Sequence, residues 1–228
     1  MKQNGTLLST VADTEELIDT IGDEHISTTK ETPLREDAFE IDDDLKVELI
    51  EKHFKEIMNI LGLDLTDDSL RGTSIRVAKM YVKEIFSGLN PQNKPKVSLF
   101  ENKYRYNQML VEKNITLYSN CEHHFVPIVG KAHVAYISNG NVIGLSKINR
   151  IVQYYAQRPQ VQERLTEQIA EELKSILKTE DVAVLIDAEH LCVSSRGIKD
   201  VNSATVTAHY SGKFQEESTK NEFLKYLD

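Results

Sequence analysis

The sequence predicts an α+β protein with a largely antiparallel sheet. Apolar residues recur at helical spacing in two segments of the first half of the chain and in two more after its middle. Segments rich in β-branched and aromatic residues lie between these helical pairs and after the second pair. The order helix-helix, strands, helix-helix, strands is typical of the α+β class.

Two helices are predicted first. Residues 42–64 place apolar side chains at helical spacing, begin with acidic residues and end in a glycine. Residues 67–90 repeat these signals, with Asp67 or Asp68 as the expected N-cap and Gly88 as the stop. A loop containing two prolines follows and separates this helical pair from the strands.

Four strands are predicted in two groups. Residues 109–119 and 126–138 are rich in β-branched and aromatic residues, and "NGN" at 139–141 predicts a hairpin turn after them. Residues 182–195 and 203–214 have the same character and are joined by a short polar loop. We therefore expect the second group to close the sheet near the C-terminus.

The segments between the two strand groups predict a second helical pair. The first of these helices is expected to have Ser146 as its N-cap and to stop before Pro159, because a proline restricts the residue before it. The second, over residues 160–178, is longer and carries alternating charged and apolar positions. Ser146 is a good N-cap whatever else it does.

Charge divides the 228-residue chain unevenly. Residues 1–44 contain 3 Lys and Arg against 13 Asp and Glu, a net charge of −10, while the remaining residues hold 24 basic and 23 acidic side chains, a net charge of +1. A negative arm is not suited to nucleic acid. We expect residues 1–41 to be a flexible acidic extension and residues 42–228 to form the functional domain.

The cellular location of the protein and the state of its cysteines are predicted from features that the sequence lacks. It has no apolar run long enough to cross a membrane, and its first residues have no signal-peptide pattern. Two cysteines do not make a disulfide framework, and in a reducing compartment metal binding or catalysis explains them better. We expect a soluble cytoplasmic protein.

Both cysteines lie beside histidines. Cys121, Glu122, His123 and His124 are consecutive, and two residues separate Cys121 from His124, a spacing that a tight turn can close around one zinc ion. Glu122 is expected to be solvated or to support the ligands. The other possibility is that both cysteines are small buried side chains and the histidines are structural, but two Cys–His groups favour a metal.

The second group holds His190 and Cys192, which are i and i+2 on a predicted strand and should share one face. Such a strand could bring Cys192 to the turn at Cys121. Three protein ligands plus water are typical of catalytic zinc, which would leave two histidines nearby for proton transfer. Spacing alone does not decide whether His123, His124 or His190 is a ligand. The remaining histidines are expected to be structural: His25, His53, His133 and His209.

Several long motifs together resemble one family. "RVAKMYVKEIFSGL", "SNCEHHFVPIVGKAHVAYI", "IGLSKINRIVQYYAQRPQVQERLTEQIA" and "HLCVSSRGIKDVNSATVT" are similar to zinc-dependent GTP cyclohydrolase I, over about residues 45–215. The resemblance implies the tunnelling fold, in which antiparallel sheets with helices on one side assemble into a barrel. It implies a homodecamer of two face-to-face pentamers, with active sites between subunits.

The implied activity is hydrolysis of GTP at guanine C8, with release of formate and ring reclosure to 7,8-dihydroneopterin triphosphate. The resemblance implies that Cys121, His124 and Cys192 hold Zn²⁺ and that His123 and His190 are catalytic. It also implies substrate-binding residues around the guanine, the ribose and the triphosphate. These are Gln162 and Glu163 at the guanine edge, then Ser146, Lys147, Arg150 and Arg196, with Arg76 and Lys79 reaching from a neighbouring subunit.

The sequence departs from the family pattern at Ser74, where many relatives carry proline, which puts the start of that helix in doubt. A zinc deaminase acting on purines is a rival interpretation, but its paired "PCxxC" and preceding "HxE" are missing. A non-catalytic tunnelling-fold assembly that binds purines or pterins is the second rival. The intact His123, His190 and Glu163 argue against it.

Overall fold

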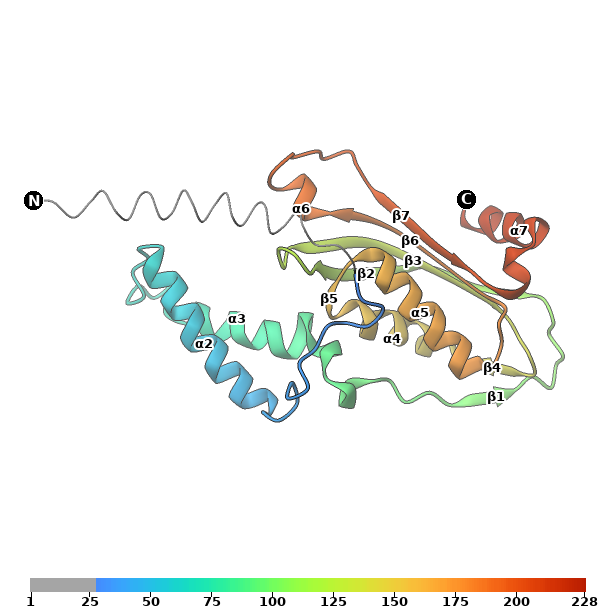
Figure 1. Cartoon of the computed structure of the whole chain (residues 1–228), viewed down its shortest axis with the longest axis horizontal. Helices are drawn as coiled ribbons and strands as arrows, with labels where there is room; N and C mark the ends of the chain where they lie inside the picture. Colours follow the sequence, from blue (N-terminus) through green and yellow to red (C-terminus); the bar gives the residue numbers. More distant parts are fainter. Residues whose placement is uncertain (1–27) are drawn as a thin grey trace, which may run out of the picture. The chain divides into compact units, whose positions relative to one another are not determined.

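Residues 28–228 are described by the structure, a computed structural model (Figure 1). The chain divides into two compact units, residues 1–30 and 31–228, and the second is described below. His25, which was expected to be structural, lies outside the described residues. Within residues 28–228, no helix has the length and apolar character needed to cross a membrane.

A five-stranded sheet in the order β5-β2-β3-β6-β7 forms the centre of the second unit. All neighbouring strands run antiparallel except β2 and β5, which are parallel. The α+β class with a largely antiparallel sheet is therefore confirmed. The strands are β2 (Met109–Cys121), β3 (Pro127–Ile137), β5 (Pro159–Gln160), β6 (Val182–His190) and β7 (Thr205–Tyr210).

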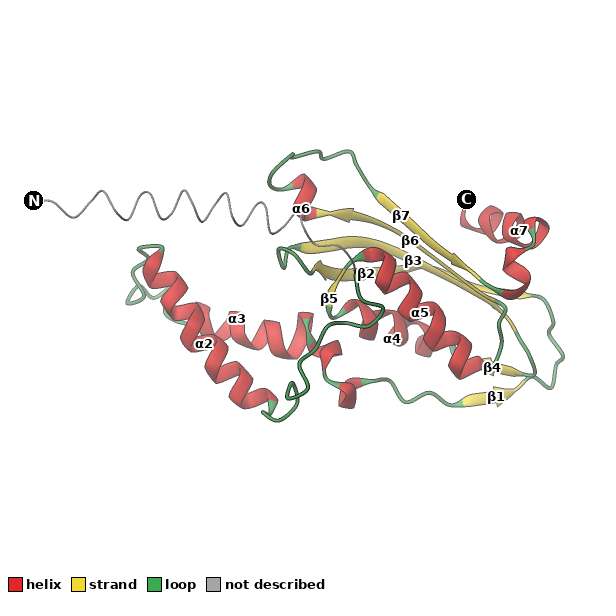
Figure 2. Ribbon diagram, in the orientation of Figure 1, coloured by secondary structure: helices red, strands yellow, loops and turns green. Residues whose placement is uncertain are grey.

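Two helices, α4 (Leu145–Ala156) and α5 (Gln162–Leu177), cover one face of this sheet, as Figure 2 shows. Their apolar faces are fully buried against alternate strand residues, and this contact forms the main core. Leu165, Ile169 and Leu173 of α5 are each 0% exposed. The helix α4 begins at Leu145 with Gly144 as N-cap, so Ser146 is not the N-cap that the sequence predicted.

The opposite face of the sheet is covered near one end by α7 (Glu217–Leu227), which the sequence analysis did not include. Phe223 of this helix and Phe214 before it are both 0% exposed and stack edge-on against each other. They pack against Met109, Ala135 and Ala183, which point away from the main core. Strand alternation therefore supplies two cores from the same strands.

The predicted N-terminal helical pair is present but less regular than expected. The first helix, α2 (Asp43–Ile60), has Asp42 as its N-cap. The second, α3 (Thr73–Met80), is followed directly by a π-helical turn, η1 (Tyr81–Ile85). Neither Asp67 nor Asp68 is its N-cap, because Gly72 holds that position. Asp67 instead accepts bonds from the backbone and hydroxyl of Ser69, which closes a local turn.

Two strand predictions were also wrong in detail. The strand predicted over residues 182–195 ends at His190, and a single helical turn, α6 (Leu191–Ser194), follows it. The "NGN" turn does not close a hairpin ladder, since β4 (Asn141–Ile143) pairs with β1 (Leu99–Glu101) in a separate two-stranded sheet. Two short 3₁₀ turns, η2 (Ser87–Leu89) and η3 (Pro91–Asn93), lead towards β1, and η4 (Gly212–Gln215) leads into α7.

Candidate active site

A closed turn after β2 brings Cys121 and His124 together. The Cys121 backbone N–H donates to Val126 O, and the Phe125 N–H donates back to Cys121 O, each at 2.9 Å. Phe125 adopts a left-handed backbone with φ of 54°, which lets the chain reverse over so few residues. As a result, Cys121 Sγ and His124 Nδ1 lie 3.6 Å apart.

Cys192 approaches the same turn from α6. Its thiol, Cys121 and His124 each offer one ligand atom, and these atoms all lie within 4.8 Å of one another. Tetrahedral zinc at its usual bond lengths would separate a sulfur from a nitrogen by roughly 3.6 Å, so the donor set fits this metal. Cys192 reaches the turn from a helical turn rather than from the predicted strand, because β6 ends at His190.

Burial and nearby charges affect the thiol and the imidazole of this group differently. Burial and the proximity of Cys121 raise the pKa of the Cys192 thiol. Burial, with the nearby Arg196 guanidinium, lowers the pKa of His124. Arg196 Nη1 lies 2.8 Å from His124 Nε2, and a guanidinium can only donate, so this nitrogen is unprotonated. In the neutral ring the proton then lies on Nδ1, the nitrogen that faces Cys121 Sγ, so metal binding through Nδ1 requires the contact with Arg196 to rearrange.

Glu122 anchors the turn to α5. Its carboxylate accepts two bonds from the guanidinium of Arg164, at 2.5 and 3.4 Å. The side chain of Arg164 is only 3% exposed, and that of Glu122 is 20% exposed. The burial of Arg164 was not foreseen from the sequence, although its position beside core residues of a helix could have indicated it. Removal of either side chain would break this largely buried ion pair.

His190, the last residue of β6, is held by α5. Its Nε2 lies 2.8 Å from Oε1 of Gln162, the first residue of that helix. Burial lowers the pKa of His190, and the carboxylate of Glu163 partly opposes this effect. Gln162 is 1% exposed, whereas Glu163 is exposed and faces solvent. His123, in the turn, keeps half of its side chain exposed, and its Nε2 lies 4.0 Å from the Glu122 carboxylate.

Comparison with known proteins shows the family of this chain. The family model of GTP cyclohydrolase I matches residues 50–228. The chain belongs to the GTP cyclohydrolase I family. GTP cyclohydrolase 1 of Flavobacterium johnsoniae is 63% identical over 213 residues, covering 93% of this chain and 96% of the relative. GTP cyclohydrolase 1 of Escherichia coli O1:K1 / APEC is 57% identical over 196 residues, covering 86% and 88%.

Among solved structures, the apo form of the archaeosine synthase QueF-Like shares 18% identity with this chain. The match covers 46% of this chain and 93% of that one, with a TM-score of 0.39. That overlap is too slight to establish a shared fold. The membership of the GTP cyclohydrolase I family therefore rests on sequence alone.

The residues that the resemblance assigned to the triphosphate are not all brought to the Cys–His turn within one chain. Ser146 and Lys147 lie at the start of α4, just after β4, and Lys147 Nζ donates to Lys96 O. Figure 1 shows β4 and α6 at opposite ends of the sheet. The 11 residues of β3 separate these ends. At about 3.4 Å per residue, this distance exceeds the reach of any side chain.

The other predicted cations occupy three places. Arg150 lies one turn further along α4, beside Gln153 and Tyr154, and Arg196 contacts His124 as described above. Arg76 and Lys79 are exposed on α3. This helix begins at Thr73, so it forms although Ser74 replaces the proline expected from the resemblance. Ser74 is 2% exposed in the first turn of this helix, a position where serine and proline are both tolerated.

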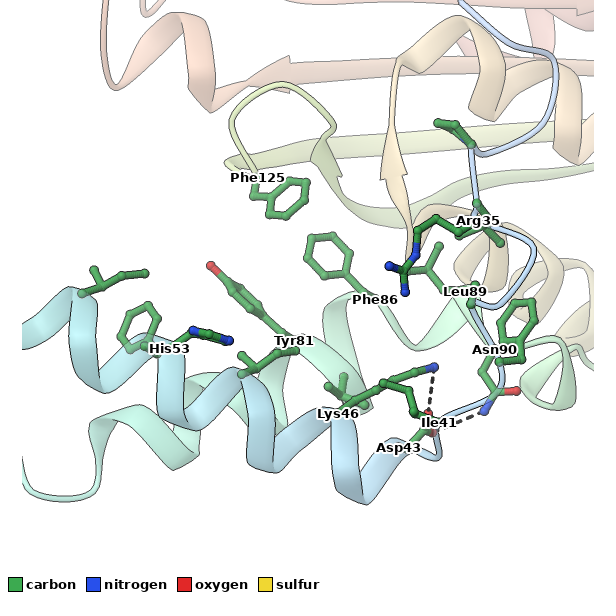
Figure 3. Close-up of a pocket in the computed structure, with 18 residues that line it drawn as sticks. Arg35, Ile41, Asp43, Lys46, His53, Tyr81, Phe86, Leu89, Asn90 and Phe125 are labelled. Carbon is green, nitrogen blue, oxygen red and sulfur yellow. Dashed lines mark hydrogen bonds and ion pairs between the residues drawn. The ribbon is translucent and has the colours of Figure 1, made fainter. Parts of the chain in front are cut away.

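A largely apolar cavity of about 570 Å³ lies between the helical pair and the segment before it. Figure 3 shows Phe86 beside Phe125, whose rings are 4.9 Å apart, with Tyr81 and His53 along the wall. Phe125 directly follows His124, so this cavity adjoins the turn that carries the ligands. Nothing in its lining assigns it an occupant.

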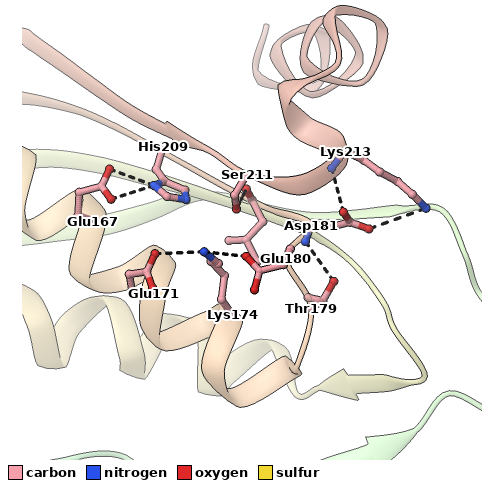
Figure 4. Close-up of polar contacts among 10 residues, drawn as sticks. Glu167, Glu171, Lys174, Thr179, Glu180, Asp181, His209, Ser211 and Lys213 are labelled. Atoms are coloured by element: carbon pink, nitrogen blue, oxygen red, sulfur yellow. Dashed lines mark hydrogen bonds and ion pairs between the residues drawn. The ribbon is translucent and has the colours of Figure 1, made fainter.

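A second group of possible ligands lies on the outer side of α5. Glu167, Glu171 and His209 gather there, and His209 Nδ1 lies 3.0 Å from both oxygens of Glu167 (Figure 4). Glu171 is paired with Lys174, which also contacts Glu180. Glu167 and Lys174 account for these contacts of His209 and Glu171, and a structural role for His209 stays a prediction.

Proposed function

We propose that this chain hydrolyses GTP at guanine C8, releases formate and recloses the ring to 7,8-dihydroneopterin triphosphate. This reaction is the first step of pterin and tetrahydrofolate biosynthesis. The observation that carries the proposal is the convergence of Cys121, His124 and Cys192, with His123 and His190 close in sequence to these three. The family membership supports the same activity.

Zn²⁺ held by Cys121, His124 and Cys192 is the cofactor in this proposal. When bound, zinc lowers the pKa of a coordinated water from about 15.7 to about 7, which makes hydroxide available at neutral pH. Attack on C8 moves electron density to N7, and His123 supplies the proton there. His190 supplies a proton to the ribose ring oxygen when the sugar opens. Both imidazoles act as general acids in this proposal.

Guanine selectivity is assigned to Glu163, at the start of α5. A carboxylate can accept hydrogen bonds from guanine N1–H and the exocyclic amine together, and adenine lacks this donor pair. Glu163 is exposed and within one residue of Gln162, so its side chain is available to a ligand. The triphosphate is assigned to the fixed cations Lys147, Arg150 and Arg196, with Ser146 as a hydroxyl donor.

Assembly completes the site in this proposal. Because Ser146 and Lys147 lie at the opposite end of the sheet from Cys121, one chain cannot present both groups to one GTP molecule. A neighbouring subunit must supply the second group, and Arg76 and Lys79 would come from a neighbour as well. This supports a homo-oligomer, for which we propose the family's decamer of two pentamers. We assign the catalytic domain to residues 42–228.

The decisive experiment is a formate assay with GTP, with and without a chelator, accompanied by elemental analysis. We expect about one zinc per chain, formate release from GTP, and loss of both zinc and activity in Cys192→Ser. Full zinc occupancy and normal turnover in this variant would overturn the ligand assignment. Zinc-bound protein that binds GTP without releasing formate would favour the alternative, a non-catalytic purine-binding or pterin-binding assembly.

A further inference from the structure

The carboxamide of Gln162 makes more hydrogen bonds within the protein than a substrate-binding side chain would make. It is 1% exposed at the first position of α5. Its Nε2 donates to Thr205 O at 2.8 Å, to Ile186 O at 3.1 Å and to Thr207 Oγ1 at 3.2 Å. The amide therefore reaches between β6 and β7, where Ile186 and Thr207 are paired across the two strands.

These contacts fix which way the amide points. Backbone carbonyls can only accept hydrogen bonds, so the NH₂ group must face Thr205 O and Ile186 O. The carbonyl oxygen of Gln162 must then face the other way, towards His190. The usual ambiguity between amide nitrogen and oxygen is removed here by the chemistry of the neighbours.

Two threonines add to this orientation. Thr166 Oγ1 donates to Gln162 O, the helical carbonyl four residues before it. Since that hydroxyl proton is used, Thr207 must donate to Thr166 across their 2.7 Å contact. Thr207 Oγ1 is left as an acceptor, which is the role that the Gln162 NH₂ group requires of it.

The orientation of the amide decides the tautomer of His190. Gln162 Oε1 has no proton to give, so the 2.8 Å contact requires a proton on His190 Nε2. In the neutral ring, Nδ1 is then the unprotonated nitrogen, as is usual where one ring nitrogen is fixed by a hydrogen bond.

We infer that Gln162 is a positioning residue that holds His190 as its Nε2–H tautomer and makes Nδ1 the nitrogen that exchanges a proton with the substrate. The inference rests on the proposed function, in which His190 transfers a proton. It differs from the guanine contact that the resemblance implies for Gln162, because a buried amide with all its polar atoms engaged has nothing left for a base edge. Glu163 alone would then read the guanine.

The first test needs no substrate, and a variant serves only to assign the signal. Protein labelled with ¹⁵N-histidine is examined by NMR at mildly alkaline pH, where protonated and unprotonated ring nitrogens resonate far apart. The His190 signal is assigned by its absence in His190→Ala. We expect a proton on Nε2, and a proton on Nδ1 would overturn the inference even if the protein releases formate from GTP. Conversely, absence of formate release from the unmodified protein would contradict the proposed function and leave this measurement valid.

The second test separates positioning from guanine binding. Gln162→Met keeps the length of the side chain but removes its hydrogen bonds, so His190 loses its fixed tautomer. We expect kcat to fall roughly 10- to 100-fold, as for other losses of a bond that orients a functional histidine. The KM for GTP should stay within about threefold. A raised KM with an unchanged kcat would show a guanine contact and overturn the inference.

Ser211→Ala is the matched control. Ser211 lies just after β7, is 8% exposed, and donates its hydroxyl to Val182 O of β6 at 3.1 Å. Its loss removes the same kind of buried bond to the same strand, away from His190. We expect the control to leave kcat and the His190 ¹⁵N spectrum unchanged. An equal fall in kcat in the control would show that loosening of the sheet, rather than loss of the tautomer, explains the effect of Gln162→Met.

Discussion

The helices α5 and α2 are similar in length but differ in what they bury. Nine of the 16 residues of α5 are buried, including three polar side chains and one charged side chain that reach the Cys–His turn, His190 or the strands. Only Val47 and Met58 of the 18 residues of α2 are buried. Leu45, Leu49 and Ile57 stay between 41% and 49% exposed.

The difference shows where the geometry of the site comes from. The helix α5 is fixed by a core on one side and by bonds from Gln162 and Arg164 on the other, so His190 and the turn are held by the same rigid element. The helix α2 has apolar side chains at helical spacing but little to pack them against among residues 28–228. In the proposed oligomer, a neighbouring subunit would cover this face.

The largest effects on turnover should follow changes of the two histidines near the start of α5, His123 and His190. We expect His123→Ala and His190→Ala each to retain zinc and to lose about 10²- to 10⁴-fold in turnover, since each removes a general acid. Without His123, GTP should persist, because attack on C8 lacks its proton donor. Without His190, a ring-opened formamide intermediate should accumulate. Chromatography of quenched reactions distinguishes these outcomes.

Elemental analysis of the same two variants provides the control. Loss of zinc from both would make these residues ligands and contradict the proposed division of roles. Normal turnover in both would mean that the proton-transfer groups lie elsewhere.

The next largest effect is the loss of unfolding free energy when one leucine side chain on each helix is shortened to alanine. Leu165→Ala, at a position that is 0% exposed on α5, should lower the free energy of unfolding by about 2–5 kcal/mol, because it leaves a cavity in the main core. Leu49→Ala, at 41% exposure on α2, should cost about 0.5 kcal/mol or less at low protein concentration. Urea unfolding measures both.

The dependence on protein concentration further distinguishes these two variants. If a second subunit covers α2, the cost of Leu49→Ala should grow as the protein is concentrated, while that of Leu165→Ala should not. Equal costs for the two variants at low concentration would contradict the contrast drawn between the helices.

A smaller effect depends on pH. His133 of β3 is 7% exposed, and its Nδ1 accepts a bond from the Asn114 N–H at 3.4 Å. Burial lowers the pKa of His133 below its unfolded value of about 6.5, so the folded state binds fewer protons. Its contribution to stability is therefore complete above that value and is lost as pH falls through 6.5 towards the folded pKa, by at most about 1.4 kcal/mol per pH unit.

His133→Gln should flatten this part of the stability profile, measured by urea unfolding between mildly alkaline and mildly acidic pH. His53→Gln, at an exposed position on α2, is the matched control and should leave the profile as it is. A profile that is unchanged by His133→Gln would mean that this ring does not titrate differently on folding.

The smallest effect is expected from the acidic extension. Deletion of residues 1–30 should leave the rate of formate release largely intact, because the compact unit begins at residue 31. Deletion through residue 41 also removes Leu34, Phe39 and Ile41 from the wall of the apolar cavity. We expect this second deletion to weaken the packing of α2 while the rate persists. A truncated protein that folds and assembles but does not process GTP would contradict this.

The sequence by itself determined the class of the fold, the Cys–His ligand candidates and the family. Apolar periodicity specifies helices and strands because each must bury one face, and ligand types specify a metal because few side chains can hold one. It also indicated that Cys121 and His124 share a turn, since these two residues lie within a stretch of four residues.

Only the tertiary structure decided contacts that join distant segments. The sequence could not show that Cys192 follows the end of its strand, because the β-rich pattern continues past His190 while the hydrogen bonding of β6 to β3 stops there. Nor could it show that Arg164 is buried against Glu122, or that Gln162 reaches between β6 and β7 to hold His190. Helix position alone leaves such side chains free to face solvent, and their partners are fixed only when α5 packs onto the sheet.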